Sequence, residues 1–396
     1  MIYFYFLIFL TVTIFLLKKD FFNPACITLF VWSVVEIIYQ NVDHGLNKLS
    51  PLFFEITFFW CLCFSLGCLI VSNMNFKVNN SCYHFPDIGS CKMYTLLFTS
   101  LSFSIFFVIL NAKETGLSPI GYVRNIGLNS DNVPLSVKII NLLTTLIYPC
   151  VFLFIELKVK RIKKLLIFLL FFILSILSGS KSAVMQIFIT SFFLLFYHRK
   201  FKILPFIVMS SVLICGFVVI TLFRDNGKSK VDFIELIYIY FLSPLPAFDL
   251  LINNKLSVNE YPVASTVLGL FYRILSKITG SYVPDSGLGF VFVPVPTNVY
   301  TIMLTGYLDF GRYGMFLFSF FYGILWGIFY SFVKRNYKFY KILYACFLNV
   351  LCLQFFADYL FPYLAIFIYQ ILIIEFIYHK SKFTDFNYLR LKIHND

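Results

Sequence analysis

Charged residues are scarce in this sequence. Only 13% of the 396 residues are charged and 60% are hydrophobic, whereas about a quarter of the residues in an ordinary soluble domain are charged. This balance excludes a typical water-soluble domain. A bilayer core about 30 Å thick is crossed by roughly 20 mostly apolar residues, so the chain has room for many crossings. The sequence therefore predicts an all-α, polytopic integral membrane protein whose residues 1–396 form a single membrane domain.

The signatures of several enzyme classes are also missing. The sequence contains no Walker-type glycine loop, no HExxH element and no Gly-x-Ser-x-Gly element. The ten cysteines and five histidines follow no spacing typical of a zinc site or a disulfide framework. We therefore expect no metal ion and no cofactor, and neither a metal-dependent nor a serine-hydrolase mechanism is supported.

Basic residues outnumber acidic ones, which gives a formal net charge of +13. Such an excess is compatible with nucleic-acid binding, but here Lys and Arg gather just beyond apolar runs, as membrane insertion requires. We expect no nucleic-acid partner. Placing the C-terminus inside puts most of the 32 Lys and Arg residues on the cytoplasmic side, including the two short basic loops at residues 158–164 and 199–202.

Seven apolar runs are each suited to one crossing. They are residues 2–17, 22–39, 52–71, 94–110, 137–155, 203–223 and 313–333. The first run has no basic segment before it and no small-residue cleavage site after it, so we expect it to remain as a span rather than to be removed.

Two further apolar runs, residues 165–197 and 342–378, are too long for one crossing at 1.5 Å per residue. Residues 179–182, Gly-Ser-Lys-Ser, interrupt the first run, and Asp358 and Pro362 interrupt the second. We expect each run to form a helical hairpin, which brings the total to about 11 transmembrane helices.

Residues 224–312 form the largest segment between predicted spans, on the outer side in this topology. A loop of this length is usually functional. Its apolar stretches, residues 236–248 and 286–308, contain prolines, so we expect re-entrant or interfacial pieces rather than spans. The alternative is a crossing by residues 286–308, which would invert the topology of everything before it.

Charged residues inside apolar runs are costly and mark candidate sites. Glu36, Glu55 and Glu375 lie near span ends, from which a side chain can reach the interface. Lys181 differs, because Gly179 and the neighbouring serines free the helix ends and place backbone amides next to a cation, an arrangement suited to phosphate. The alternative is a plain hairpin turn whose lysine reaches lipid headgroups.

A second polar cluster precedes the span at residues 313–333. Asn298, Tyr300, Tyr307, Asp309 and Arg312 supply amide, aromatic, carboxylate and guanidinium groups, which together suit a sugar diphosphate. Alternatively, Asp309 and Arg312, three positions apart, pair with each other at the helix start.

Two other basic sites lie within residues 224–312. Arg224 and Asp225 directly follow a span, and Arg273 and Lys277 lie one turn apart in an expected amphipathic helix. Either pair of positions could bind phosphate, or could carry only the charges usual at a membrane boundary.

The residues around these clusters resemble the bacterial O-antigen polymerases, also called oligosaccharide repeat unit polymerases. The resemblance is carried by LSGSKS at residues 177–182, TNVYT at 297–301 and YLDFGRYG at 307–314, before a span that contains Gly323 and Gly327. Many members have arginine where this chain has Lys181. The change replaces a bidentate guanidinium by a point charge.

The resemblance implies a glycosyltransferase of the bacterial inner (cytoplasmic) membrane, with residues 224–312 as one large periplasmic loop. Its substrate would be an oligosaccharide carried on undecaprenyl diphosphate, transferred onto the next lipid-linked repeat unit. That reaction needs an activated acceptor hydroxyl and fixed cations for the diphosphate. Membrane lipids, and a chain-length regulator and flippase of the same pathway, are the expected partners.

Site roles follow from the resemblance and the residue types. Asp309 is the first candidate for the base or acceptor-positioning group, with Asp225 second. The catalytic candidates are Lys181, Asp309 and Arg312, and the substrate-binding candidates are Arg224, Arg273, Asn298, Tyr300 and Tyr307.

Two alternatives use related substrates. An O-antigen ligase or other lipid-linked glycan transferase is expected to have a histidine in its outer loop, and residues 224–312 contain none, which favours the polymerase. A polysaccharide flippase or other transporter is often built from paired repeats with broken helices in matching positions, and the two halves of this sequence show no such symmetry.

Overall fold

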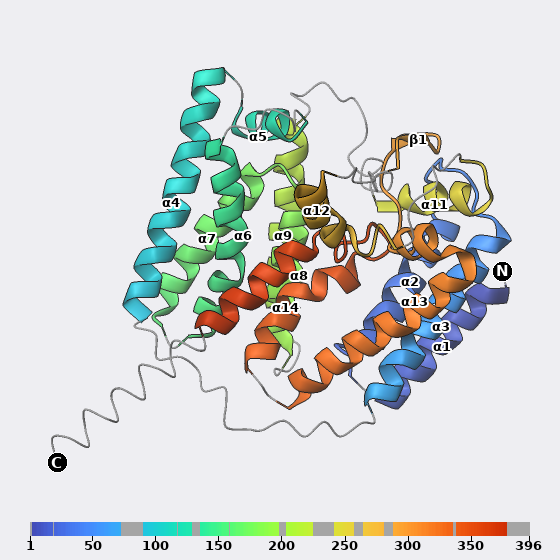
Figure 1. Ribbon diagram of the computed structural model, residues 1–396. Coiled ribbons are helices and arrows are strands. Elements are labelled where there is room, and N and C mark those ends of the chain that lie inside the picture. The colour runs from blue at the N-terminus through green and yellow to red at the C-terminus, as the bar shows by residue number, and fades with distance from the viewer. Residues whose placement is uncertain are drawn as a thin grey trace, which may run out of the picture. The chain divides into compact units, whose positions relative to one another are not determined.

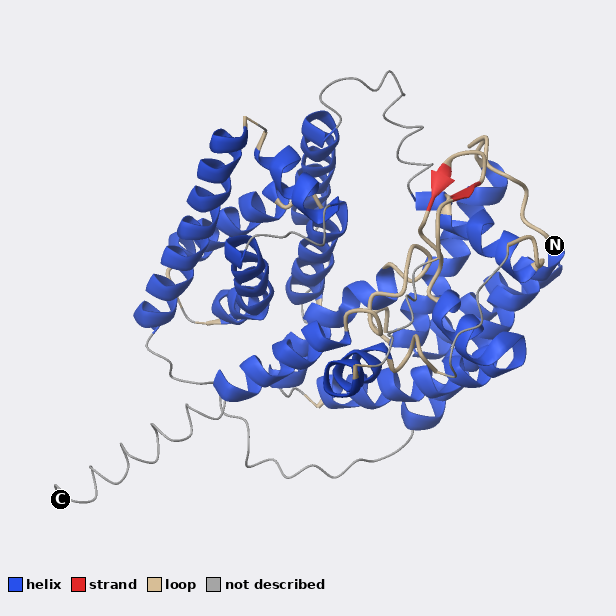
Figure 2. Ribbon diagram, turned by 45° about the horizontal axis from the view of Figure 1, so that its top comes forward, coloured by secondary structure: helices blue, strands red, loops and turns tan. Residues whose placement is uncertain are grey.

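The computed structural model describes most of the chain as helix, with one short pair of strands (Figure 2). The described residues are 2–18, 20–72, 90–116, 118–128, 135–157, 159–197, 203–224, 241–256, 264–280, 288–335 and 338–377. Asp225 and residues 236–240 of one predicted interfacial stretch lie outside them. The predicted all-α membrane class is confirmed in its helical character.

The chain divides into two compact units. The first consists of Met1–Val78, Lys230–Arg335 and Leu348–Ala365, and the second of Asn79–Ser229, Asn336–Phe347 and Ile366–Asp396. That both units belong to one membrane domain stays a prediction.

The first unit contains three long helices from the N-terminal part of the chain and one from the C-terminal part. Its elements are α1 (Ile2–Lys18), α2 (Pro24–Asn41), α3 (Pro51–Ser72), α11 (Pro244–Ile252), α12 (Gly269–Thr279), β1 (Val291–Phe292), β2 (Pro296–Thr297) and α13 (Met303–Lys334). Figure 1 shows α3 and α13 side by side, although more than 200 positions separate them.

Glycines set the close approach of α3 to α13. A Cβ atom on Gly323 would lie 2.1 Å from the carbonyl oxygen of Phe64, and one on Gly67 would lie 2.2 Å from the carbonyl oxygen of Phe320. Small residues of this kind let two membrane helices pack backbone against backbone. Tight packing along both helices therefore holds the start of α3 close to α13.

The second unit is a bundle of helices. Its elements are α4 (Ser90–Thr115), α5 (Pro119–Leu128), α6 (Leu135–Glu156), α7 (Arg161–Leu177), α8 (Lys181–Phe196), α9 (Ile203–Arg224), the first part of α14 (Lys338–Cys352) and most of the apolar helix Leu364–Ile377. The short α5 was not expected from the sequence.

The nine apolar runs read from the sequence form helices, and the predicted breaks inside the two longest runs are confirmed, whereas the pairing of each run into a membrane hairpin stays a prediction. Residues 178–180 separate α7 from α8, and residues 353–363, which include Asp358, separate α14 from the last helix. Among the described residues, three helices are long and apolar enough to cross a membrane: Pro51–Val71, Cys91–Thr115 and Met303–Lys334. The count of about 11 spans stays a prediction.

Prolines act differently at the two apolar stretches of residues 224–312. A turn at Ser243 separates helical residues 241 and 242 from α11, and Pro244 is the first residue of α11, where a proline is tolerated because the amide it lacks has no helical partner. In the other stretch β1 pairs antiparallel with β2, with Val291 opposite Thr297, and α13 begins only at Met303. The described part of residues 286–308 is thus not one continuous helix.

Candidate functional site

An ion pair joins the starts of two long helices in the first unit. The guanidinium of Arg312 on α13 donates a hydrogen bond to the carboxylate of Glu55, in the first part of α3. The Arg312 and Glu55 side chains are 35% and 31% exposed. The pair is therefore accessible, and Glu55 is held by a partner rather than extended alone.

The backbone breaks directly before Arg312. Gly311 has φ 66° and ψ −171°, so α13 consists of two helical parts joined at a kink. Positive φ is the conformation that glycine adopts without steric cost. The kink lies between Asp309 and Arg312, so the two residues belong to different helical parts of α13.

Asp309 is bound to the segment before α12. Its carboxylate accepts hydrogen bonds from the backbone amides of Thr266, at 3.0 Å, and Val267, at 2.7 Å, and from the Thr266 hydroxyl. The alternative in which Asp309 pairs with Arg312 is therefore not what the structure contains. Asp309 ties residues 266 and 267 to the first part of α13.

A buried carboxyl group lies in the break after α14. Asp358 is 9% exposed and accepts hydrogen bonds from the Thr305 hydroxyl, at 2.6 Å, and from the backbone amide of Leu360, at 2.9 Å. Burial raises the pKa of Asp358 to about 6, and these hydrogen bonds act in the opposite direction. This group is thus poised to change charge near neutral pH.

A third carboxylate ties α11 to α3. Asp249 on α11 is 8% exposed and accepts hydrogen bonds from the backbone amide of Ser50, at 3.1 Å, and from the Asn253 side chain, at 3.0 Å. Ser50 immediately precedes α3. Asp249, Asp309 and Asp358 therefore all organise loops at the end of the first unit where α3 begins.

The two tyrosine candidates of this unit pack against neighbouring side chains and do not point into solvent. Tyr300 is 4% exposed, packs against Ala247 and Val293, and donates a hydrogen bond to the carbonyl oxygen of Gly289 at 3.2 Å. Burial raises the pKa of Tyr300 to about 12. Tyr307 is half-buried with its ring edge against Phe248.

The polar candidates beside them are accessible. Asn298 follows β2 and is exposed, and Arg273 is exposed on α12. Arg224 is the last residue of α9, and its side chain lies outside the described residues.

In the second unit, Lys181 is buried. It is the first residue of α8, is 7% exposed, and places its Nζ atom 5.9 Å from the centre of the Phe217 ring. Gly179 has φ 66° and ends the preceding turn. Ser180 accepts a hydrogen bond from the backbone amide of Ala183 at 3.4 Å. The start of α8 therefore has the expected cation, but the Ser180 side chain already caps one of its backbone amides.

The described residues hold no cluster of three or more His, Cys, Asp and Glu side chains arranged to bind a metal ion. The arrangement in the first unit instead combines a half-exposed guanidinium with carboxylates and an exposed amide. It is suited to an anionic, hydroxyl-rich ligand.

A family model described as "Putative O-antigen polymerase" matches residues 2–354. The chain belongs to the O-antigen polymerase family. A relative from Escherichia coli (strain K12), described in the same words, is 25% identical over 375 residues, which is 89% of this chain and 92% of the relative. No solved structure matches the chain. The function predicted from the sequence, that of an O-antigen polymerase, is confirmed at the level of the family.

The O-antigen polymerase match contains every catalytic and substrate-binding candidate, from Lys181 to Arg312. Lys181 belongs to the second unit, and Asp309 and Arg312 belong to the first. That these residues form one site stays a prediction, as do their individual roles.

Sequence reasoning missed Asp249 and used Asp358 only as a helix breaker. Asp358 lies beyond the matched residues, but a single acid inside a long apolar run was a signal that could have found it. Asp249 gave no such signal, because its partner Ser50 is 199 positions away.

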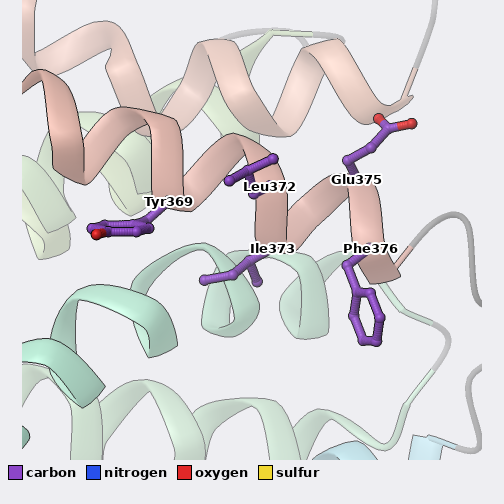
Figure 3. A pocket seen from close by; sticks show the side chains of 5 residues that line it. All are labelled: Tyr369, Leu372, Ile373, Glu375 and Phe376. Carbon is purple, nitrogen blue, oxygen red and sulfur yellow. The ribbon is translucent and has the colours of Figure 1, made fainter.

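Two other acids of the O-antigen polymerase chain stand apart from this site. Glu36 on α2 is 1% exposed, so it does not reach out of its helix as the sequence suggested. Glu375 borders a pocket of about 510 Å³ in the second unit whose other lining residues are mostly apolar (Figure 3). The pocket is lined by Tyr369, Leu372, Ile373, Glu375 and Phe376, and it offers no cation for a diphosphate.

Proposed function

We propose that this member of the O-antigen polymerase family joins oligosaccharide repeat units carried on undecaprenyl diphosphate, on the periplasmic face of the bacterial inner membrane. In the transfer, the bond between the first sugar of the growing chain and its diphosphate breaks. The diphosphate leaves with the bonding electron pair, and a hydroxyl of the next lipid-linked unit forms the new glycosidic bond and loses its proton.

The environment of Arg312 is the observation that best supports this proposal. Its guanidinium has five N–H donors, and Glu55 engages one terminal nitrogen. The buried Nε atom has no hydrogen-bond partner among the described residues. Because the Arg312 side chain is 35% exposed, its guanidinium is anchored by Glu55 and still accessible, which suits the terminal oxygens of a diphosphate, whose charge grows as the glycosidic bond breaks.

Lys181 is the second proposed cation. Its position at a helix start adds favourable backbone amides to its charge. We propose that Lys181 and Arg312 both contact the donor diphosphate, with Arg224 and Arg273 contributing to its approach.

Asp309 is the proposed acceptor-side group. The amides of Thr266 and Val267 and the Thr266 hydroxyl use three of the roughly four acceptor positions of its carboxylate, so one position on Oδ2 is left for the acceptor hydroxyl. Asn298, Tyr300 and Tyr307 are proposed to line the acceptor side, Asn298 through its exposed amide and the two tyrosines by shaping the wall.

The orientation proposed from charge places residues 224–312 in the periplasm and the C-terminus in the cytoplasm. A periplasm-active phosphatase fused after Asn254 should be active, and the same enzyme fused after Lys160 should not. The reverse result would place the proposed site on the wrong face.

Deletion of the gene in its host, followed by electrophoresis of the surface glycan, tests the function. We expect the ladder to collapse to core plus one repeat unit, and full ladders to return on complementation. Loss of every capped band would favour a ligase or a flippase instead.

A further inference from the structure

The amphipathic helix α12 has no buried residue. Phe271, Ile274, Leu275 and Ile278 are 58%, 49%, 51% and 78% exposed. They stand at positions i, i+3, i+4 and i+7, which places them along one stripe of the helix. Four large apolar side chains on a single face need a cover that the described residues do not supply.

The opposite face of α12 is basic. Arg273 and Lys277 are one turn apart and exposed, and Ser276 lies between them. Gly280 ends the helix in the left-handed conformation, with φ 69°. A short helix with an apolar stripe and a cationic back is the pattern of a segment that lies in the plane of a membrane surface, with its charges at the level of lipid phosphates.

Asp309 fixes where α12 begins. Its carboxylate holds the amides of Thr266 and Val267, two to three residues before Gly269. Asp309 is itself two residues before the Gly311 kink, after which Arg312 meets Glu55 at the start of α3. Because α3 and α13 are each long and apolar enough to cross a membrane, we infer that the level at which Arg312 meets Glu55 is close to the membrane surface and that α12 starts near it.

We propose that α12 is an interfacial helix that inserts Phe271, Ile274, Leu275 and Ile278 among lipid acyl chains and binds lipid phosphate groups through Arg273 and Lys277. The occupant of its apolar face is the bilayer, on the side where α3 begins. Asp309 is the positioning residue that tethers α12 beside Arg312. The inference concerns the membrane and does not depend on which glycan the protein transfers.

Tryptophan fluorescence tests the insertion. The chain contains three tryptophans, and Trp32, Trp60 and Trp326 are each at most 1% exposed, so the wild-type protein gives a steady background. I278W places a new tryptophan on the apolar stripe, and S276W is the matched control on the polar face. Each full-length variant is reconstituted in phosphatidylcholine vesicles with or without bromine on the acyl chains.

We expect brominated lipid to remove about half or more of the added emission in I278W and little of the added emission in S276W. Equal quenching of the two variants would overturn the insertion. So would an I278W signal that resists both brominated lipid and aqueous acrylamide, because the stripe would then be covered by protein.

A second measurement tests the phosphate contact. Brominated phosphatidylglycerol at about one fifth of the lipid should quench I278W more than random mixing predicts. R273Q and K277Q together, in the I278W background, should reduce quenching to the random value. Random quenching with both basic residues present would overturn the headgroup contact while leaving the insertion result to stand by itself.

Discussion

Arg312 and Glu55 form an ion pair across 257 positions of sequence. The pair joins the second helical part of α13 to the first part of α3, directly after the kink at Gly311. Below it, Gly67 and Gly323 bring the two helix backbones into contact. A guanidinium fixed in this way is already oriented before a ligand arrives, which is what electrostatic stabilisation of a leaving group requires.

Arg312→Ala should lower polymerisation by about ten- to hundredfold. A charge-assisted hydrogen bond is worth roughly 1.5 to 3 kcal/mol, and each 1.36 kcal/mol is about tenfold in rate. Arg312→Lys should recover part of the loss, because it restores charge but not the planar donor set. Glycan ladders from complemented deletion strains provide the measurement, with membrane levels checked by immunoblot.

Glu55→Gln separates orientation from charge. It keeps an acceptor for Arg312 but removes the counter-charge, so activity should fall less than in Arg312→Ala. A Glu55→Gln strain as defective as Arg312→Ala, at equal protein level, would mean that the ion pair itself and not the guanidinium is what the reaction needs.

Lys181→Arg should retain more activity than Lys181→Ala, because charge is the main requirement at the start of α8. The expected loss for alanine is again about tenfold or more. Because Lys181 is buried against Phe217, insertion and thermal stability of each variant must be compared with wild type. If a normally inserted Lys181→Ala protein still produced full ladders, Lys181 would have only a structural role.

Asp309→Asn distinguishes acceptor chemistry from tethering. The amide oxygen of the introduced asparagine can still accept a hydrogen bond from the Thr266 or Val267 amide, so the tether to residues 266 and 267 would survive in part. The variant could not act as a base toward the acceptor hydroxyl. We expect Asp309→Asn to be more defective than Asp309→Glu in chain elongation. Thr266→Val, which removes only the hydroxyl donor, is the matched control and should reduce activity less than either.

The pH dependence of stability should report Asp358. Its pKa in the folded protein, about 6, is above its ordinary value, so the folded state binds the proton more tightly than the unfolded state does. The protein should therefore lose stability as pH rises from about 4 to about 7, by at most roughly 3 kcal/mol. Asp358→Asn should flatten this dependence in thermal unfolding of the purified protein. An unchanged pH profile in that variant would show that Asp358 is not the responsible group.

Local sequence patterns predicted much of the fold. Apolar runs predicted every long helix, and Gly179 and Pro362 lie in the two predicted helix breaks, because backbone conformation at those positions is decided by the residues themselves. The short helix α5 was missed, since its ten residues include two glycines and a proline.

Long-range partners could not be read in the same way. Nothing near Arg312 in sequence indicates Glu55, and nothing near Asp309 indicates Thr266, because these contacts depend on how separate elements pack. The helical residues 303–310 before the Gly311 kink were not predicted either, because the expected span began only at residue 313. The candidate residues were therefore found, but their pairing was not.

Chain growth by the purified protein tests the central claim most directly. Reconstituted in lipid vesicles and supplied with repeat units linked to undecaprenyl diphosphate, the wild-type protein should build a ladder of lengthening chains and release one undecaprenyl diphosphate per new linkage. Because we expect no metal ion, the ladder should persist in chelator. Absence of any chain longer than one unit, or growth that occurs only with added magnesium or manganese, would contradict the account.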